Sequence, residues 1–89
     1  MRVRFWEARV ADGRLSDALA WVNAQVTAPA HAAGAQQVEV FVAEADVPTN
    51  NPARVVVLTR WGHEGGWTDP DISTDAIERA HGWDFRSHE

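Results

Sequence analysis

The chain has 89 residues, with 13 acidic and 8 basic side chains and a formal net charge of −5. This length predicts one domain, residues 1–89, and the acidic balance argues against a nucleic-acid partner, because phosphate binding needs a basic surface. The absence of cysteine excludes disulfides, thiol catalysis and Cys-ligated zinc or iron–sulfur sites. No apolar run is long enough to span a membrane and no signal peptide is recognised. We therefore expect a cytoplasmic protein with no membrane partner.

The basic and aromatic residues are unusually biased. All eight basic residues are arginine, and the aromatic residues include five tryptophans but no tyrosine. Without lysine, Schiff-base and P-loop chemistry are excluded, and the arginine bias is typical of a GC-rich bacterial genome. No Rossmann or serine-hydrolase signature occurs either. We therefore expect no cofactor.

The first predicted elements are a strand over residues 3–10 and a helix that begins near residue 14. Side chains of the strand alternate between two faces, and both faces carry apolar groups. The apolar positions of the helix recur at helical spacing and are Leu15, Leu19, Val22 and Val26. Pro29 is expected to break or kink this helix, and Gly34 to terminate its continuation.

Two further strands are predicted over residues 37–43 and 54–61, joined by a long, exposed loop that is rich in proline and asparagine. Asp69-Pro70 then predicts the start of a short second helix, which Gly82 ends. The apolar side of this helix consists of Ile72, Ala76, Ile77 and Ala80. A last strand is expected after residue 82, with Trp83 and Phe85 on the same face.

This β-α-β-β-α-β order predicts an α+β, ferredoxin-like fold, with an antiparallel sheet and two helices on one of its faces. The other face carries apolar groups such as Val3, Phe5 and Phe41 beside charges. A monomer of this length that exposes such a face would be marginally stable. We therefore predict a homodimer that forms through the sheet face.

Charged residues are also predicted on that face. Glu7 and Arg9 share one face of the first strand, and Glu39 and Arg60 are expected on the equivalent face of their strands. Charges buried between two subunits have to pair with one another. We therefore favour an inter-subunit ion-pair network or a solvated edge over acid–base catalysis for these residues.

Three stretches resemble the dimeric α/β-barrel superfamily, and in particular its antibiotic-biosynthesis-monooxygenase-like proteins. They are the strand at 3–10 with the following Asp12-Gly13, the Gly34-Ala35 turn, and the strand at 55–61 that closes with Trp61. The resemblance covers residues 3–61. It implies a dimeric barrel and cofactor-independent oxygenation of a small aromatic or polyketide-type molecule.

The chain departs from this family after Trp61. Members continue there into a long helix, whereas this chain has a glycine-rich segment over residues 62–67. The haem-degrading branch needs an asparagine where this chain has Trp6, and a histidine at the position of Pro70. Haem degradation is therefore disfavoured.

The candidate site combines three tryptophans with two histidines. We predict that Trp6, Trp61 and Trp67 line a ligand pocket, with His63 or His81 as the catalytic proton acceptor near neutral pH. The alternative is that large aromatic side chains simply fill a small core and that the histidines are solvated. His63-Glu64 resembles the start of a zinc-protease motif, but the second histidine of that motif is replaced by Trp67. We expect no metal site.

Two functions follow from the sequence. The first is a cofactor-independent monooxygenase-like enzyme that acts in a cleft beneath the tryptophans. The second is a non-catalytic dimeric module that binds a small aromatic ligand or has an accessory role. An open cavity that reaches one of the two histidines would favour the enzyme, and a packed interior would favour the module.

Overall fold

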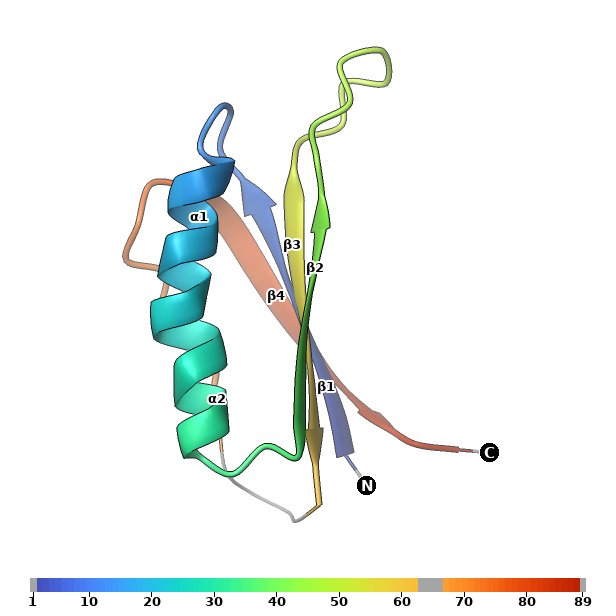
Figure 1. Cartoon of the computed structure of the whole chain (residues 1–89). Helices are drawn as coiled ribbons and strands as arrows, with labels where there is room; N and C mark the ends of the chain where they lie inside the picture. The colour runs from blue at the N-terminus through green and yellow to red at the C-terminus, as the bar shows by residue number, and fades with distance from the viewer. Residues whose placement is uncertain (1, 63–66, 89) are drawn as a thin grey trace.

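The computed structural model describes residues 2–62 and 67–88 and has an α+β architecture, in which a helix packs on one face of an antiparallel sheet (Figure 1). The strands are β1 (Arg2–Val10), β2 (Gln37–Ala43), β3 (Arg54–Trp61) and β4 (Ile77–Arg86). Their order in the sheet is β2-β3-β1-β4. The α+β class, the antiparallel sheet and the strands predicted over residues 37–43 and 54–61 are confirmed.

The helix continues past Pro29 instead of breaking there. It is composed of α1 (Leu15–Val22), a π-helical turn (Asn23–Thr27) and α2 (Ala28–Ala32). In the π-helical turn the Ala28 N–H donates to the Asn23 carbonyl, five residues earlier. A proline in a regular helix lacks one hydrogen bond and crowds the carbonyl four residues before it, and a wider turn immediately before Pro29 relieves that crowding.

The helix ends at a glycine in the left-handed region, as the sequence predicted. Gly34 has a φ of 98°. Its N–H donates to the His31 carbonyl at 3.0 Å, and the Ala35 N–H donates to the Ala30 carbonyl at 3.1 Å. These two bonds form a Schellman motif, which satisfies carbonyls that the last turn leaves without partners.

The prediction of a second helix is wrong. Residues 67–76 contain no helix, and β4 begins at Ile77 and pairs with β1 along its length. The register shifts by one residue near the start of β4, so that Ile77 pairs with Val10 while Ala80 pairs with Ala8. This β-bulge places both side chains on the helix-facing side although they are three residues apart. That spacing is typical of a helix, which explains the mistaken prediction.

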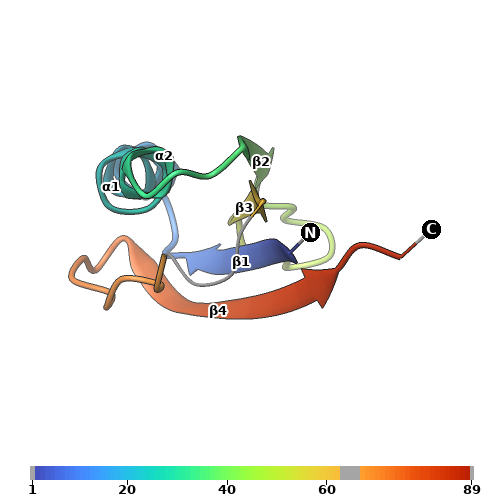
Figure 2. The same ribbon diagram turned by 90° about the horizontal axis from the view of Figure 1, so that it is seen from below.

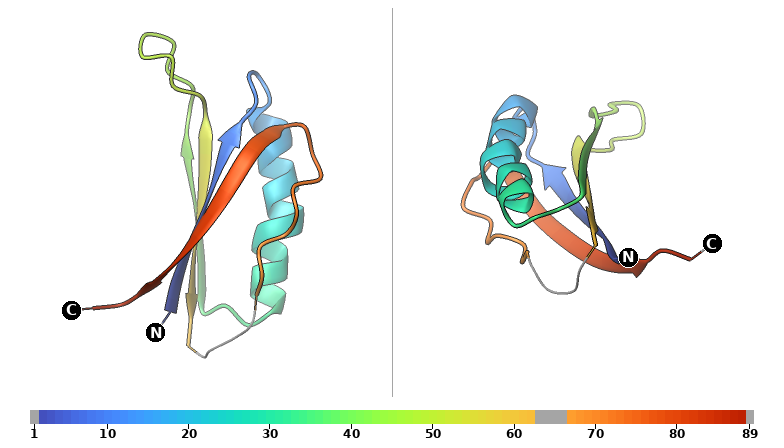
Figure 3. Two further views of the ribbon diagram at one scale, coloured as in Figure 1. Left: turned by 180° about the vertical axis from the view of Figure 1, so that it is seen from behind. Right: turned by 60° about the horizontal axis from the view of Figure 1, so that its bottom comes forward.

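The hydrophobic core lies between the helix and the sheet. Its buried members include Trp6, Ala8, Val10, Val22, Val26, Val55, Val57 and Ile77. The connection over residues 67–76, called the strap below, runs alongside the helix and takes the position where a second helix was expected (Figure 3). Trp67 and Trp21 pack against this core. Within the described ranges, no helix has the length and apolar character that crossing a membrane requires.

Replacing Gly34 with alanine tests the helix terminus. We expect the Gly34→Ala variant to lose about 1–2 kcal/mol of unfolding free energy in urea titrations, because a Cβ is strained at this φ. Gly34→Asn is the matched control and should lose less, since asparagine tolerates the left-handed region. Equal losses for the two variants would contradict the conformational explanation.

Candidate functional site

Trp6 and Trp61 lie on the helix-facing side of the sheet, on the neighbouring strands β1 and β3, and both are buried. The Trp6 ring stacks on Trp21 with 6.4 Å between ring centroids. The Trp61 indole N–H donates to Thr59 Oγ1 at 2.9 Å. Trp67 is partly buried against the same core. The structure therefore brings the three predicted pocket residues to one side of the sheet, where they pack as core side chains do.

The two predicted proton acceptors do not join this group. His81 pairs with Glu7 in the sheet, on the face opposite to Trp6 and Trp61. Its exposed ring lies 5.9 Å from that of Trp83. His63 falls outside the described residues. The sheet thus separates His81 from the buried tryptophans, and the catalytic role predicted for the two histidines stays a prediction.

A partly buried arginine stands beside the tryptophans and was not singled out from the sequence. Arg4 Nε and Nη2 donate to Asp69 Oδ1 and Oδ2 at 2.9 and 2.5 Å, and Nη1 lies 3.1 Å from Asp84 Oδ1. The hydrogen bonds to Asp69 are the main reason that the pKa of Arg4 is raised, although partial burial opposes them. A Cβ at Gly82 would overlap Arg4 Nη2 and Asp69 Oδ2, so the glycine makes room for the cluster. The signal in the sequence was the presence of arginine on the face of β1 that also carries Trp6, Ala8 and Val10.

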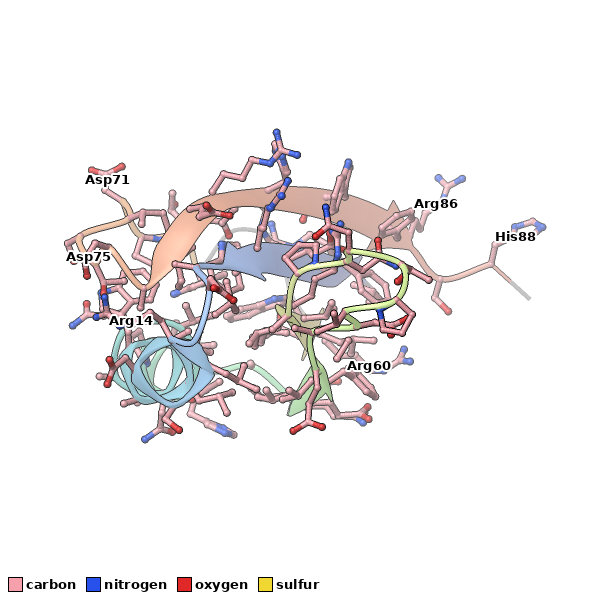
Figure 4. All side chains as sticks on the ribbon, turned by 90° about the horizontal axis from the view of Figure 1, so that it is seen from above. Arg14, Arg60, Asp71, Asp75, Arg86 and His88 are labelled. Carbon is pink, nitrogen blue, oxygen red and sulfur yellow. The ribbon has the colours of Figure 1, made fainter. Side chains whose placement is uncertain are left out.

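Polar contacts hold the strap against the rest of the fold at three places. Besides the Arg4–Asp69 pair, the Trp21 indole N–H donates to Ser73 Oγ at 3.1 Å. Arg14 lies 3.1 Å from Asp75, at the corner labelled in Figure 4. The pKa of Arg14 is raised, first by its hydrogen bond to Asp17 and then by the one to Asp75. The arrangement is structural, because each of these side chains is engaged within the chain.

The helix packs on one side of the sheet and leaves the opposite face without a covering helix (Figure 2), and this face carries large apolar side chains. Sheet register places six of them together, here called the aromatic face: Val3, Phe5, Phe41, Leu58, Trp83 and Phe85. Phe41, Trp83 and Phe85 are 49%, 47% and 51% exposed. The rings of Phe5 and Phe85 meet edge to face at 5.4 Å. The prediction that Val3, Phe5 and Phe41 lie on the face away from the helix is confirmed.

The charged residues predicted on this face also lie there. Glu7 accepts a hydrogen bond of 2.6 Å from Arg54, and Arg9 lies 3.0 Å from Glu78. Arg60 and Glu39 occupy diagonal positions at the border of the aromatic face. Among the described residues neither of these two forms an ion pair within the chain.

A cleft of about 630 Å³ lies at the end of the sheet where β1 ends, between the turn after β1, the β2–β3 loop and the start of β4. Its charged lining consists of Arg9, Asp12, Glu44, Asp46 and Glu78. This lining favours a cation over an anion. None of Trp6, Trp61, Trp67 and His81 lines it. In the described part of the chain, no group of three histidine or carboxylate side chains is placed to hold a metal ion.

Comparison with known proteins assigns neither a family nor a function to this chain. No family model, no curated protein and no solved structure matches the chain.

Removing the Asp69 carboxylate tests whether the pair with Arg4 holds the strap. We expect Asp69→Ala to lower the unfolding free energy by about 1–3 kcal/mol, because the loss of a charge-assisted pair leaves Arg4 with Asp84 alone. Amide hydrogen exchange of residues 68–76 should accelerate in the same variant. Asp71→Ala, an exposed position on the strap, is the control and should remain within about 0.5 kcal/mol of the unmodified chain. Similar losses at both positions would refute the assignment.

Proposed function

We propose that this chain is a homodimeric module that packs sheet against sheet through the aromatic face, and that it has a binding or accessory role. The observation that carries the proposal is the group of three half-exposed aromatic side chains, Phe41, Trp83 and Phe85, on one uncovered face. Large contiguous apolar patches on a small protein mark interaction sites. A second copy offers the same patch and therefore a self-complementary partner.

The size of the face is adequate for a specific interface. A large aromatic side chain buries about 150–250 Å², so three half-exposed rings on each of two copies supply roughly 600 Å². Specific protein–protein interfaces bury about 1,200–2,000 Å² in total. The aromatic side chains alone therefore provide up to half of the area, and the surrounding residues of the sheet provide the remainder.

The charges at the border of the face support the same arrangement. Arg60 and Glu39 have opposite sign and form no ion pair with each other or with another described residue of the chain. In the proposed two-fold dimer we expect each arginine to pair with the partner's glutamate, and symmetry makes this pairing twice. This pair accounts for two of the four charged residues that the sequence suggested for an inter-subunit network.

The placement of the histidine favours the module over the oxygenase. A proton acceptor must reach the substrate within hydrogen-bonding distance, directly or through one water. His81 is on the opposite side of the sheet from Trp6 and Trp61, and both tryptophans are buried. The strand order supports a ferredoxin-like sheet, in which the strap replaces the second helix of the dimeric α/β-barrel family.

Replacing an aromatic residue of the face with a charge should abolish the dimer. We expect the unmodified chain to sediment as a dimer at micromolar concentration, and Trp83→Asp and Phe85→Asp to sediment as folded monomers. Burial of a new carboxylate at the centre of the interface is strongly unfavourable. Val47→Asp is the control, because Val47 is 86% exposed in the β2–β3 loop and lies outside the face. A monomeric unmodified chain would overturn the proposal.

A charge exchange tests the pairing of Arg60 with Glu39. Arg60→Glu and Glu39→Arg should each weaken the dimer by about tenfold or more, because like charges then meet across the two-fold axis. The double variant restores opposite charges and should recover most of the affinity in sedimentation equilibrium. Additive losses in the double variant would show that the two residues do not meet.

A further inference from the structure

Three arginines lie side by side on the side of the sheet that the helix leaves uncovered, at the end away from Phe85. Arg54 of β3 pairs with Arg9 of β1, and Arg9 pairs with Arg79 of β4. These three residues are called the arginine row below. Side chains directly opposite each other in antiparallel strands have Cβ atoms about 5 Å apart, and like charges in such positions are destabilising. The row is therefore electrostatically unfavourable in the isolated chain.

Two carboxylates offset part of this positive charge. Arg54 Nη1 donates to Glu7 Oε1 at 2.6 Å, and Arg9 Nε lies 3.0 Å from Glu78 Oε1. Arg79 is exposed and forms no ion pair with another described residue. Among the residues that the structure describes, three positive charges of the row thus contact two negative charges, and the third arginine has no counter-charge.

The guanidinium groups of the row also retain donors for a ligand. A guanidinium has five N–H donors in a planar fork, which can bind two oxygens of one anionic group. Within the described part of the chain, the Arg54 side chain donates one hydrogen bond, and the side chains of Arg9 and Arg79 donate none. Arg9 Nε is buried and without a hydrogen-bond partner in spite of its short distance to Glu78. Most of the donors are therefore available to an anion that lies over the row.

The spacing and the competing carboxylates indicate the chemistry of this anion. Two steps between neighbouring strands place the outer arginines of the row about 10 Å apart. Two linked anionic groups can contact neighbouring arginines at the same time, which a single group does less well. A phosphate group carries a charge of about −1.5 to −2 and three acceptor oxygens, so it competes for the arginine donors with Glu7 and Glu78, which carry one negative charge each. A diphosphate group fits both requirements.

Acidic residues nearby set the direction from which the ligand approaches. Arg9 also lines the cleft at the end of the sheet, together with Asp12, Glu44 and Asp46. None of these three carboxylates forms an ion pair with a described arginine of the row. They would repel an anion inside the cleft. We therefore expect the anion over the face of the sheet, where the three arginines lie in line.

We propose that the arginine row is a binding site for a small ligand with a diphosphate group, which accepts bidentate hydrogen bonds from neighbouring arginines. The site goes beyond the proposed dimer. Arg54 is six residues from Arg60 on β3, which corresponds to about 20 Å along the strand. The row is therefore remote from the expected pairing of Arg60 with the partner's glutamate, and the ligand binds with or without a second copy.

Calorimetric titration of the full chain with inorganic diphosphate tests the proposal, at low ionic strength and without divalent metal ions. We expect saturable binding of one diphosphate per chain, at least about tenfold tighter than that of inorganic phosphate. Amide signals in NMR spectra should shift at residues 9, 54 and 79. Equal affinity for the two anions, or shifts centred elsewhere, would overturn the proposal.

A pair of arginine variants separates a built site from general attraction of charge. Arg79→Gln should weaken diphosphate binding by about tenfold or more without a lower unfolding temperature, because it also removes a like charge from the row. Arg86→Gln is the matched control, since Arg86 lies on the same strand but on the helix-facing side, and it should bind nearly as the unmodified chain does. Equal losses in the two variants would contradict the assignment. A lower unfolding temperature of Arg79→Gln without ligand would contradict it too.

A monomeric variant separates this site from the proposed dimer. Phe85→Asp, expected to be a folded monomer, should bind diphosphate with an affinity close to that of the unmodified chain. Loss of binding in this variant would show that the site needs both subunits, which contradicts the proposal. A chain that is monomeric without any substitution and still binds diphosphate would overturn the dimer and leave the anion site supported.

Discussion

A single helix covers one face of a four-stranded sheet, and the width of the helix limits how much of that face is buried. A helix with its side chains is about 10–12 Å across, whereas the outer strands of such a sheet lie roughly 15 Å apart. The helix and the strap together cover the helix-facing side of the central strands and of the start of β4, where Ile77 is buried. In β2, Val38 packs against this core, whereas Val40 and Val42 are exposed although they point to the helix-facing side. The exposure of Val40 and Val42 is thus a consequence of the limited width of the helix, whereas the aromatic face is exposed because no described helix packs on that side of the sheet.

The strap covers part of the sheet with polar as well as apolar contacts. A helix in this place would bring an apolar stripe, whereas the strap brings Trp67 and a carboxylate that is bound by Arg4. An arginine whose guanidinium donates to two carboxylates fixes the orientation of the segments that it joins, and lysine does not reproduce this geometry. The absence of a side chain at Gly82 makes the approach sterically feasible. Packing and ion pairing therefore both hold the strap on the sheet, whereas a second helix would be held there by hydrophobic burial alone.

Local sequence patterns were sufficient for some of these elements and insufficient for others. Alternation predicted the strands at 37–43 and 54–61 with the bounds that the structure has, and it placed Trp6 on the buried side of its strand. The secondary structure of residues 69–82 was predicted wrongly, because the spacing of apolar residues around the β-bulge is also typical of a helix. The face on which His81 lies depends on that bulge and on pairing with β1, more than seventy residues earlier in the chain. Register between distant strands is not encoded in a local pattern, and the candidate site depended on it.

The bulge at the start of β4 also marks a point at which the length of the strand can change by one residue without a change of register. Removal of Glu78, which has no partner in β1, would leave Ile77 opposite Val10 and Arg79 opposite Arg9, whereas removal of one residue from the paired stretch 79–86 would turn the residues on one side of the deletion to the opposite face. The β2–β3 loop has no such constraint, because it is exposed and its ends are already joined by the hairpin. Over evolutionary time, insertions and deletions should therefore accumulate in residues 44–53, and in β4 a deletion should be tolerated at residue 78 and eliminated from residues 79–86. A difference of a single codon within that paired stretch would exchange the inside of the protein for its outside.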